Sequence, residues 1–163
     1  MKFKGTAHCF GNNVTSDSLT PTKLKETKLT MKEYVKYMLD DLRPGFYKEI
    51  KPGDFIVAGT NFGCGSSRES AAAVIRAAEM AGVIANSFSR IFLRNSVSVG
   101  LPLFECDTSL IKDGDEIEVD TDTGIIKTPS CEIEAKPFPP ALLEVVLAGG
   151  MLKYFLEHND YKV

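Results

Sequence analysis

The stretch that decides the fold is FIVAGTNFGCGSSRESAAAVI, residues 55–75. It begins with four apolar residues typical of a buried strand, passes through a loop rich in glycine and serine, and continues as an alanine-rich helix. Glycines allow close backbone approach and unusual dihedral angles, and a helix start offers unpaired N–H groups and a positive partial charge. The stretch therefore predicts a strand–loop–helix unit whose loop can hold an anionic ligand.

The pattern of strand and helix continues on the C-terminal side of this stretch. Residues 83–85 and 103–106 are short apolar runs, and a helical pattern over residues 88–99 lies between them. Alternating strands and helices are typical of a parallel sheet with crossover helices. We therefore expect the middle of the chain to form a parallel sheet.

The two ends of the chain add strands and helices to this unit. Thr30 and Glu33 have the spacing of a capping box, which predicts a helix start. Residues 116–120 and 125–127 form a hairpin pattern. The other predicted elements are a strand over 2–10, a polar loop over 11–21, helices over 31–42, 69–80, 141–147 and 151–156, and an edge strand over 131–135. Residues 1–163 are thus predicted to form a single α/β domain with a mixed sheet.

Charge and hydropathy exclude several classes of protein. The net charge is −3 with no basic block, which argues against nucleic-acid binding. No segment approaches the ~20 apolar residues of a membrane span. The start of the chain lacks the apolar region of a signal peptide, so we predict a cytoplasmic protein.

The four cysteines are Cys9, Cys64, Cys106 and Cys131. They are widely spaced, and the two histidines, His8 and His158, lie near the ends of the chain. This arrangement predicts no metal ligands in the chain. We expect the cysteines to be reduced thiols, with Cys9, Cys106 and Cys131 packed as small apolar residues.

The loop ends in Ser66, Ser67 and Arg68. Two hydroxyls and a guanidinium at a helix start suit a carboxylate or a phosphate, and a serine there can act as base or nucleophile. The alternative is that a serine only caps the helix and Arg68 is solvated. The sequence lacks the lysine of a phosphate-binding P-loop and the G-x-S-x-G turn of hydrolases.

Two long motifs add a resemblance to a known family. The runs NFGCGSSRESAA (61–72) and VIANSFSRIFLRN (83–95) closely resemble the swivelling domain of the aconitase superfamily. The form of that domain that is a separate protein is the small subunit of 3-isopropylmalate dehydratase (isopropylmalate isomerase) and of its homoaconitase relatives. The resemblance implies an aconitase-type swivelling β/β/α domain with a mixed, partly parallel sheet flanked by helices.

The resemblance also implies roles for the loop residues. In that family the first serine of the motif, here Ser66, is the catalytic base in its alkoxide form. Ser67 and Arg68 would bind a carboxylate of the substrate. The family carries its [4Fe–4S] cluster on a separate large subunit, so we expect no cofactor in this chain and a cluster-bearing partner in a heterodimer or heterotetramer. The isolated chain could form homo-oligomers.

A second active-site element of the family resembles the run Asp17-Ser18-Leu19-Thr20-Pro21. Asp17 and Thr20 match it and would contribute to substrate binding. Asn12 and Asn13 stand where the family usually has aspartate. The alternative for Asp17 is a simple Asx-turn.

Residues 22–27 fall where relatives carry the substrate-specificity loop, and its key places are occupied by Leu24, Lys25, Glu26 and Thr27. Glu26 replaces an arginine thought to read the extra group of the substrate. A glutamate there would repel a carboxylate, unless Lys25 points inward and compensates. This departure disfavours a homoaconitate-like substrate and leaves an alkyl-substituted malate.

The resulting hypothesis is a hydro-lyase that is active only with its large subunit and interconverts 3-isopropylmalate and 2-isopropylmalate, a step of leucine biosynthesis. The alternatives are a related dehydratase for dimethylmalate or homoaconitate, and a non-catalytic binding domain. A phosphate-binding module is a third possibility.

Overall fold

The computed structural model describes residues 1–24, 26–66 and 68–158. Within these residues the strands form one mixed sheet of seven strands in the order β4-β3-β2-β1-β5-β6-β7. Strands β1 to β4 are parallel to one another, whereas β5 pairs antiparallel with β1, and β6 and β7 continue the sheet in antiparallel fashion. The strand bounds are β1 Lys2–Cys9, β2 Phe55–Ala58, β3 Gly82–Ala85, β4 Leu103–Glu105, β5 Glu116–Asp120, β6 Ile125–Lys127 and β7 Glu132–Glu134.

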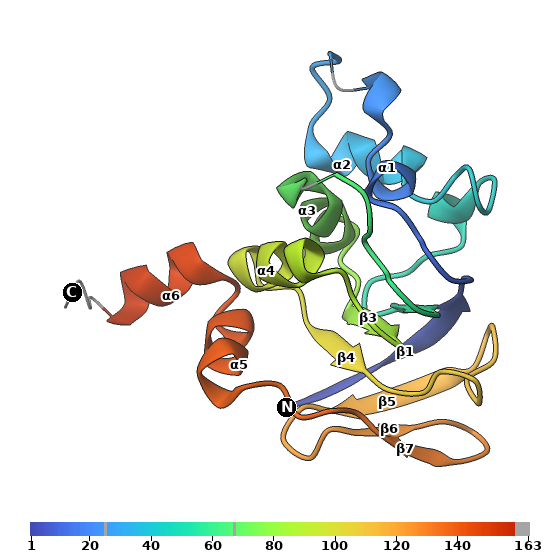
Figure 1. Ribbon diagram of the computed structural model, residues 1–163, viewed down its shortest axis with the longest axis vertical. Coiled ribbons are helices and arrows are strands. Elements are labelled where there is room, and N and C mark those ends of the chain that lie inside the picture. The colour runs from blue at the N-terminus through green and yellow to red at the C-terminus, as the bar shows by residue number, and fades with distance from the viewer. Residues whose placement is uncertain (25, 67, 159–163) are drawn as a thin grey trace.

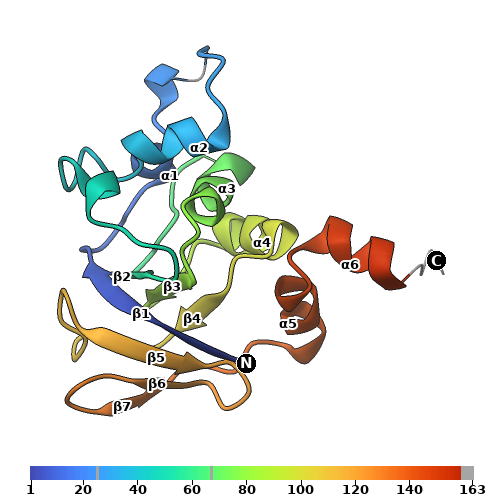
Figure 2. The same ribbon diagram turned by 180° about the vertical axis from the view of Figure 1, so that it is seen from behind.

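Helices α1 to α4 gather on one side of the sheet, and α5 and α6 lie beside it, with α6 pointing away from the body (Figures 1 and 2). Helices α3 and α4 are the crossover connections between the parallel strands β2, β3 and β4. The predicted α/β architecture is therefore confirmed. The helix bounds are α1 Ser16–Leu19, α2 Met31–Tyr34, α3 Glu69–Ala77, α4 Arg90–Val99, α5 Pro140–Leu147 and α6 Met151–His158, with 3₁₀ turns η1 Thr22–Leu24, η2 Val35–Tyr37 and η3 Phe46–Lys48.

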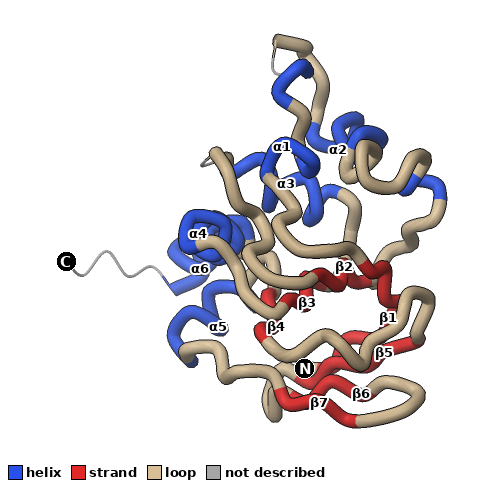
Figure 3. The backbone as a smooth tube through the Cα atoms, turned by 45° about the vertical axis from the view of Figure 1, so that its right-hand side comes forward, coloured by secondary structure: helices blue, strands red, loops and turns tan. Residues whose placement is uncertain are grey.

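The sheet separates two apolar cores. Ile56 and Ala58 of β2 join the core beneath the helices, while Phe55 and Val57 join a second core with residues of β5 and β6. Figure 3 shows how this is possible: the strand layer bends round, so that β5, β6 and β7 come to face the parallel strands. Both faces of β2 are thus buried, which explains its uninterrupted apolar sequence.

The predicted helix over residues 31–42 is wrong beyond its first turns. The capping box is confirmed, because Thr30 and Glu33 exchange hydrogen bonds at the start of α2. The α-helix ends at Tyr34, and a 3₁₀ turn follows to Tyr37. Leu39 then takes a left-handed conformation with φ +60°, and its N–H donates to the carbonyl of Ser18 at 2.7 Å. Pairing with the neighbouring segment thus replaces the helical bond.

Other predicted boundaries shift by small amounts. The polar loop over 11–21 contains the short helix α1, with Thr15 as its N-cap. The predicted helix over 69–80 ends at Ala77, and the helix over 88–99 begins at Arg90 because Ser89 caps it. Among the described residues, no helix has the length and apolar character needed to cross a membrane.

Candidate active site at the carboxyl ends of the parallel strands

The candidate site lies where β1, β2 and β3 end. The parallel pairing of β1 with β2 continues past both strands through backbone bonds from Gly59 to Gly11, from Asn13 to Thr60 and from Gly63 to Val14, at 2.8–3.1 Å. The loop after β2 therefore runs beside the loop after β1. Ligand sites of open parallel sheets typically lie at such carboxyl ends.

Close packing fixes the shape of the glycine-rich loop. Gly63 has φ +75°, and a Cβ placed on it would lie 2.3 Å from the ring of Phe92. Asn12 accepts a hydrogen bond from the backbone of Thr60 at 2.8 Å, and Asn61 donates to the side chain of Asn13 at 3.0 Å. The two asparagines that replace the expected carboxylates thus brace the loop.

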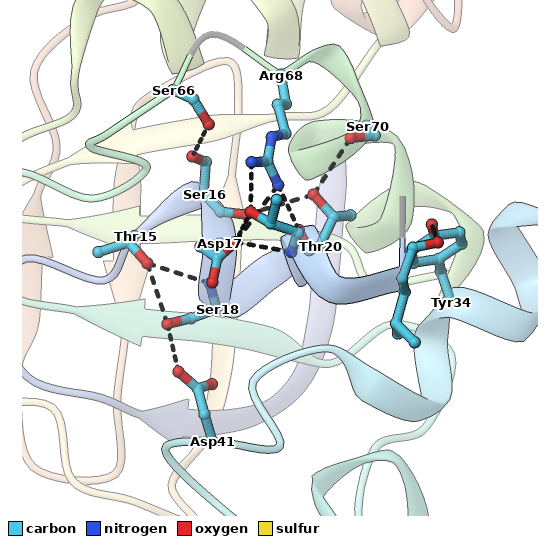
Figure 4. A network of polar contacts seen from close by, with 12 residues as sticks. Thr15, Ser16, Asp17, Ser18, Thr20, Tyr34, Asp41, Ser66, Arg68 and Ser70 are labelled. Carbon is cyan, nitrogen blue, oxygen red and sulfur yellow. Dashed lines mark hydrogen bonds and ion pairs between the residues drawn. The ribbon is translucent and has the colours of Figure 1, made fainter. Parts of the chain in front are cut away.

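Ser66 is exposed at the end of this loop. Its Oγ lies 3.3 Å from the Oγ of Ser16, a residue of α1 that is only 1% exposed (Figure 4). Ser66 does not cap α3, because the N-cap position belongs to Arg68 and no side-chain capping bond is present there. Its hydroxyl is therefore directed to the α1 segment. Ser67 lies outside the described residues.

Arg68 reaches from the start of α3 to the segment that follows α1. Its Nη1 donates to the carbonyl of Thr20 at 2.8 Å and lies 3.5 Å from Asp17, and its Nη2 donates to the Thr22 hydroxyl at 2.6 Å (Figure 4). The guanidinium is therefore ordered and only partly solvated, with 23% of the side chain exposed. An oriented guanidinium is suited to binding a carboxylate.

Asp17 lies at the edge of the same group, with 59% of its side chain exposed. Its carboxylate accepts hydrogen bonds from the hydroxyl and the backbone N–H of Thr22. These bonds, followed by the charge of Arg68, hold the pKa of Asp17 below its usual value. The contact spans five residues, so it is not the Asx-turn considered as the alternative. Asp17 stays ionised and partly balances the charge of Arg68.

Thr20 is 3% exposed. Its hydroxyl donates to the Ser16 carbonyl at 3.3 Å and lies 3.2 Å from the hydroxyl of Ser70 on α3. Its own carbonyl is the group that accepts from Arg68. Thr20 thus joins α1 to α3, and the part of it that meets the candidate site is the backbone.

The predicted specificity segment lies beside the arginine. The Leu24 carbonyl accepts a hydrogen bond from the Tyr34 hydroxyl at 2.6 Å, and Leu24 packs partly against the core. Glu26 and Thr27 are exposed, and Lys25 is outside the described residues. A cleft of about 320 Å³ opens here, lined by Thr20, Pro21, Met31, Tyr34, Arg68 and Ser70. None of the described residues of the segment lines this cleft, and the link between the two is Tyr34, which lines the cleft and binds the Leu24 carbonyl.

Thr22, at the start of the predicted specificity stretch, belongs to this arrangement, and so do Ser16 and Tyr34, which the sequence did not single out as site residues. The order of strands indicates that the loops after β1 and β2 meet, but it does not tell which side chains touch. Ser16 directly precedes the matching motif that begins at Asp17, and this adjacency is the only feature of the sequence that points to Ser16.

Two of the cysteines and one histidine are held in the packed part of the fold. Burial, together with nearby carboxylates, raises the pKa of Cys9 and of Cys106 to about 11, so both remain protonated thiols. His8 is buried and pairs with Asp54 at 2.8 Å. In the described ranges, no three His, Cys, Asp or Glu side chains come together in a way that could hold a metal ion.

Comparison with known proteins identifies the class of this fold and site. Residues 8–105 match the family model described as the aconitase C-terminal domain. Aconitase X of Thermococcus kodakaraensis, at 19% identity, has a related fold with a TM-score of 0.50 over 83% of this chain and 91% of its own. The fold is thus that of an aconitase-type domain.

Closer relatives match almost the entire chain. The 3-isopropylmalate dehydratase small subunit 2 of Archaeoglobus fulgidus is 43% identical over 100% of both chains. The 3-isopropylmalate dehydratase small subunit of Caldicellulosiruptor saccharolyticus is 44% identical over 94% of this chain and 91% of its own. The crystal structure of 3-isopropylmalate dehydratase from Methanocaldococcus jannaschii, 38% identical, superposes with a TM-score of 0.92 over 98% of this chain and 96% of its own. The chain therefore belongs to the aconitase C-terminal domain family, among the 3-isopropylmalate dehydratase small subunits.

Proposed function

We propose that this chain is the small subunit of a two-subunit hydro-lyase that interconverts 3-isopropylmalate and 2-isopropylmalate, a step of leucine biosynthesis in the cytoplasm. The observation that carries the proposal is that Ser66 and Arg68 both contact the α1 segment, through Ser16 and Thr20 respectively, in a chain that matches such small subunits along its full length. The serine supplies a base and the arginine a carboxylate anchor.

The two residues divide the work on the substrate. Arg68 would orient one carboxylate of a malate, in the manner that fixed guanidinium groups allow. Ser67 completes this carboxylate site in the proposal. Asp17 contributes to substrate binding by orienting Arg68, and Thr20 supports it through its carbonyl bond to Arg68. Ser66, as an oxyanion, would take the proton from the carbon next to the carboxylate and return it to the other carbon.

The cleft beside Arg68 supports an alkyl-substituted substrate. Pro21, Met31 and Tyr34 give it an apolar wall, and its volume is about 320 Å³. An apolar wall favours a branched alkyl group over a second carboxylate, because burying an ionised group without a partner is costly. This supports isopropylmalate or dimethylmalate over homoaconitate. Leu24, Lys25, Glu26 and Thr27 are proposed to select among such groups.

We place the [4Fe–4S] cluster on a separate large subunit. The relatives of this chain are named small subunits, which implies a larger partner that can carry the cluster. The cluster supplies a Lewis acid for the leaving hydroxyl group. Ser66 is exposed in this chain, so a partner that covers it would complete the site and exclude water. The assembly is proposed to be a heterodimer or heterotetramer, and the isolated chain can be tested for self-association.

The test is anaerobic reconstitution with the cluster-bearing protein of the same organism. The complex is assayed with 3-isopropylmalate, 2,3-dimethylmalate and homoaconitate by the absorbance of the unsaturated intermediate. The proposal predicts the highest kcat/KM with 3-isopropylmalate. Preference for dimethylmalate or homoaconitate would assign the chain to a related dehydratase. Binding of the partner without turnover of any of these acids would indicate a non-catalytic domain.

A further inference from the structure

Among the described residues, the hydroxyl of Ser66 has one side-chain hydrogen-bond partner, the hydroxyl of Ser16 at 3.3 Å. Ser16 is 1% exposed, whereas Ser66 is exposed at the surface of the loop. The two residues are 50 positions apart in the sequence. A buried hydroxyl with a single side-chain partner is held in one orientation, because burial without that bond would be costly.

The backbone keeps Ser16 next to the loop. Its N–H donates to the Cys64 carbonyl at 2.8 Å, and Thr15 forms a parallel bridge with Cys64. Its carbonyl accepts from the N–H of Thr20 at 2.9 Å, so both sides of its peptide are bonded. Gly65, next to this contact, has φ +97°, a conformation that favours glycine, and a Cβ there would meet the Ser16 hydroxyl only at an ordinary 3.4 Å. The contact with Ser66 therefore arises from the way that α1 and the loop are joined.

We propose that Ser16 is a positioning residue that orients the Ser66 hydroxyl and stabilises its ionised form. This inference rests on the proposed role of Ser66 as the base. An oxyanion can only accept hydrogen bonds, so in that state the proton of the pair lies on Ser16, which donates. Hydrogen bonds to a charged oxygen are stronger than those to a neutral one. The bond therefore favours ionised Ser66 over the neutral serine.

The hydrogen bond from Ser16 affects the rate of the step in which Ser66 takes the proton from the substrate. The Ser66 oxyanion forms an O–H bond with the substrate proton, the C–H bond breaks, and its electron pair becomes the C=C bond as hydroxide leaves the adjacent carbon. The charge on Ser66 is present before the step and lost after it. A donor fixed in advance keeps a fraction of the serine ionised without reorganisation at the moment of reaction. When the partner subunit excludes water from the site, Ser16 still donates a hydrogen bond to the Ser66 oxyanion.

The test uses the reconstituted complex and compares Ser16→Ala, Ser16→Thr and wild type over a range of pH. Loss of the donor raises the pKa of Ser66, so Ser16→Ala should lower kcat by about tenfold to a hundredfold. Its KM should change little, and the rising limb of the pH profile should move to higher pH. Ser16→Thr, which keeps the hydroxyl, should restore that limb toward the wild-type position.

The matched control is Ser96→Ala. Ser96 is buried on α4, and its hydroxyl has no hydrogen-bond partner in the part of the chain that the structure describes. This variant should keep the wild-type kcat and pH profile. Thermal melting of every variant checks that the chain remains folded.

The outcomes separate this inference from the proposed function. Suppose that wild type turns over isopropylmalate and Ser66→Ala does not. If Ser16→Ala then keeps the wild-type pH profile, the role proposed for Ser16 is wrong and the proposed function stands. If the kcat of Ser16→Ala falls only as far as its lower melting temperature explains, with no shift of the pH profile, the positioning role of Ser16 is also contradicted. If the wild-type complex acts on no substituted malate, both the function and the role of Ser16 fail.

Discussion

The guanidinium of Arg68 donates a hydrogen bond of 2.8 Å to the backbone carbonyl of Thr20, so the residue that begins α3 also holds the segment that follows α1. The same side chain reaches the hydroxyl of Thr22. The residue proposed as the carboxylate anchor is thus also a structural tie between two segments. Any substitution of Arg68 should therefore affect both the order of this segment and the binding of substrate.

Arg68→Lys keeps the charge but loses the planar fork that holds Thr20 and Thr22 together. We expect kcat/KM of the reconstituted complex for 3-isopropylmalate to fall about a hundredfold, since the lost bonds involve a charged donor. Steady-state kinetics of the complex measure this. A lysine variant within about twofold of wild type would show that the fork does not anchor the substrate.

Tyr34→Phe removes only the hydrogen bond to the Leu24 carbonyl, which ties the specificity segment to α2. The loss of about 1 kcal/mol should raise KM for 3-isopropylmalate about fivefold, while kcat changes little. The matched control is Tyr37→Phe, because Tyr37 is 38% exposed on η2. Equal KM values for the two variants would mean that the Tyr34 bond does not shape the cleft.

Asp54→Asn tests the buried pair of Asp54 and His8. Burial by itself raises the pKa of Asp54, but hydrogen bonds from His8 and from the N–H groups of Thr6 and Lys51 outweigh it and lower the pKa. Breaking such a pair should reduce the free energy of unfolding by about 3 kcal/mol at neutral pH. Urea unfolding measures this loss, with Asp107→Asn at an exposed position as the control.

The pH dependence of that loss follows from the sign of the shift. A carboxyl group whose pKa is lowered on folding adds stability above its ordinary pKa of about 4, and this stability disappears as the pH falls through the lowered value. The stability that Asp54 contributes through its own ionisation should therefore be lost as the pH falls through the lowered pKa, so the difference between wild type and Asp54→Asn should shrink in acid. A difference that grows on acidification would contradict this account of Asp54.

Gly63→Ala tests the packing of the loop. Its positive φ and the 2.3 Å approach to Phe92 leave no room for a Cβ. We expect the free energy of unfolding to fall by about 2–4 kcal/mol. Gly11→Ala is the control, because a Cβ there meets nothing within 4 Å. Similar urea midpoints for the two variants would show that the loop can adjust freely.

Much of the fold was predictable because the chain alternates clearly between strand and helix patterns. The run at 55–58 and the capping box at Thr30 gave correct elements from local chemistry alone. The helix predicted over 31–42 failed because the Leu39 N–H bonds to Ser18, a partner from another segment that no local pattern contains. The hydrophobic pattern of such a segment predicts its apolar face but not the hydrogen bonds that it forms with other segments.

The candidate site could likewise be predicted only in part from the sequence. The glycine-rich loop suggested an anion site, and the resemblance to a family assigned roles to Ser66 and Arg68. The contact of Ser66 with Ser16 depends on how the ends of β1 and β2 are joined, 50 residues apart in sequence. Asn12 and Asn13 were interpreted as missing carboxylates, whereas they brace the loop backbone and the side chain of Asn61. These contacts join segments that only the folded chain brings together, so the sequence alone could not predict them.

The most direct test of the central claim is the turnover of 3-isopropylmalate by the anaerobically reconstituted complex with wild-type chain and with Ser66→Ala. Ser66 is exposed and its side chain contributes to no apolar core, so the variant should fold and bind the large subunit as wild type does. We predict normal assembly and a fall in kcat of at least about a thousandfold. A Ser66→Ala complex that assembles and retains near-wild-type kcat would contradict the account.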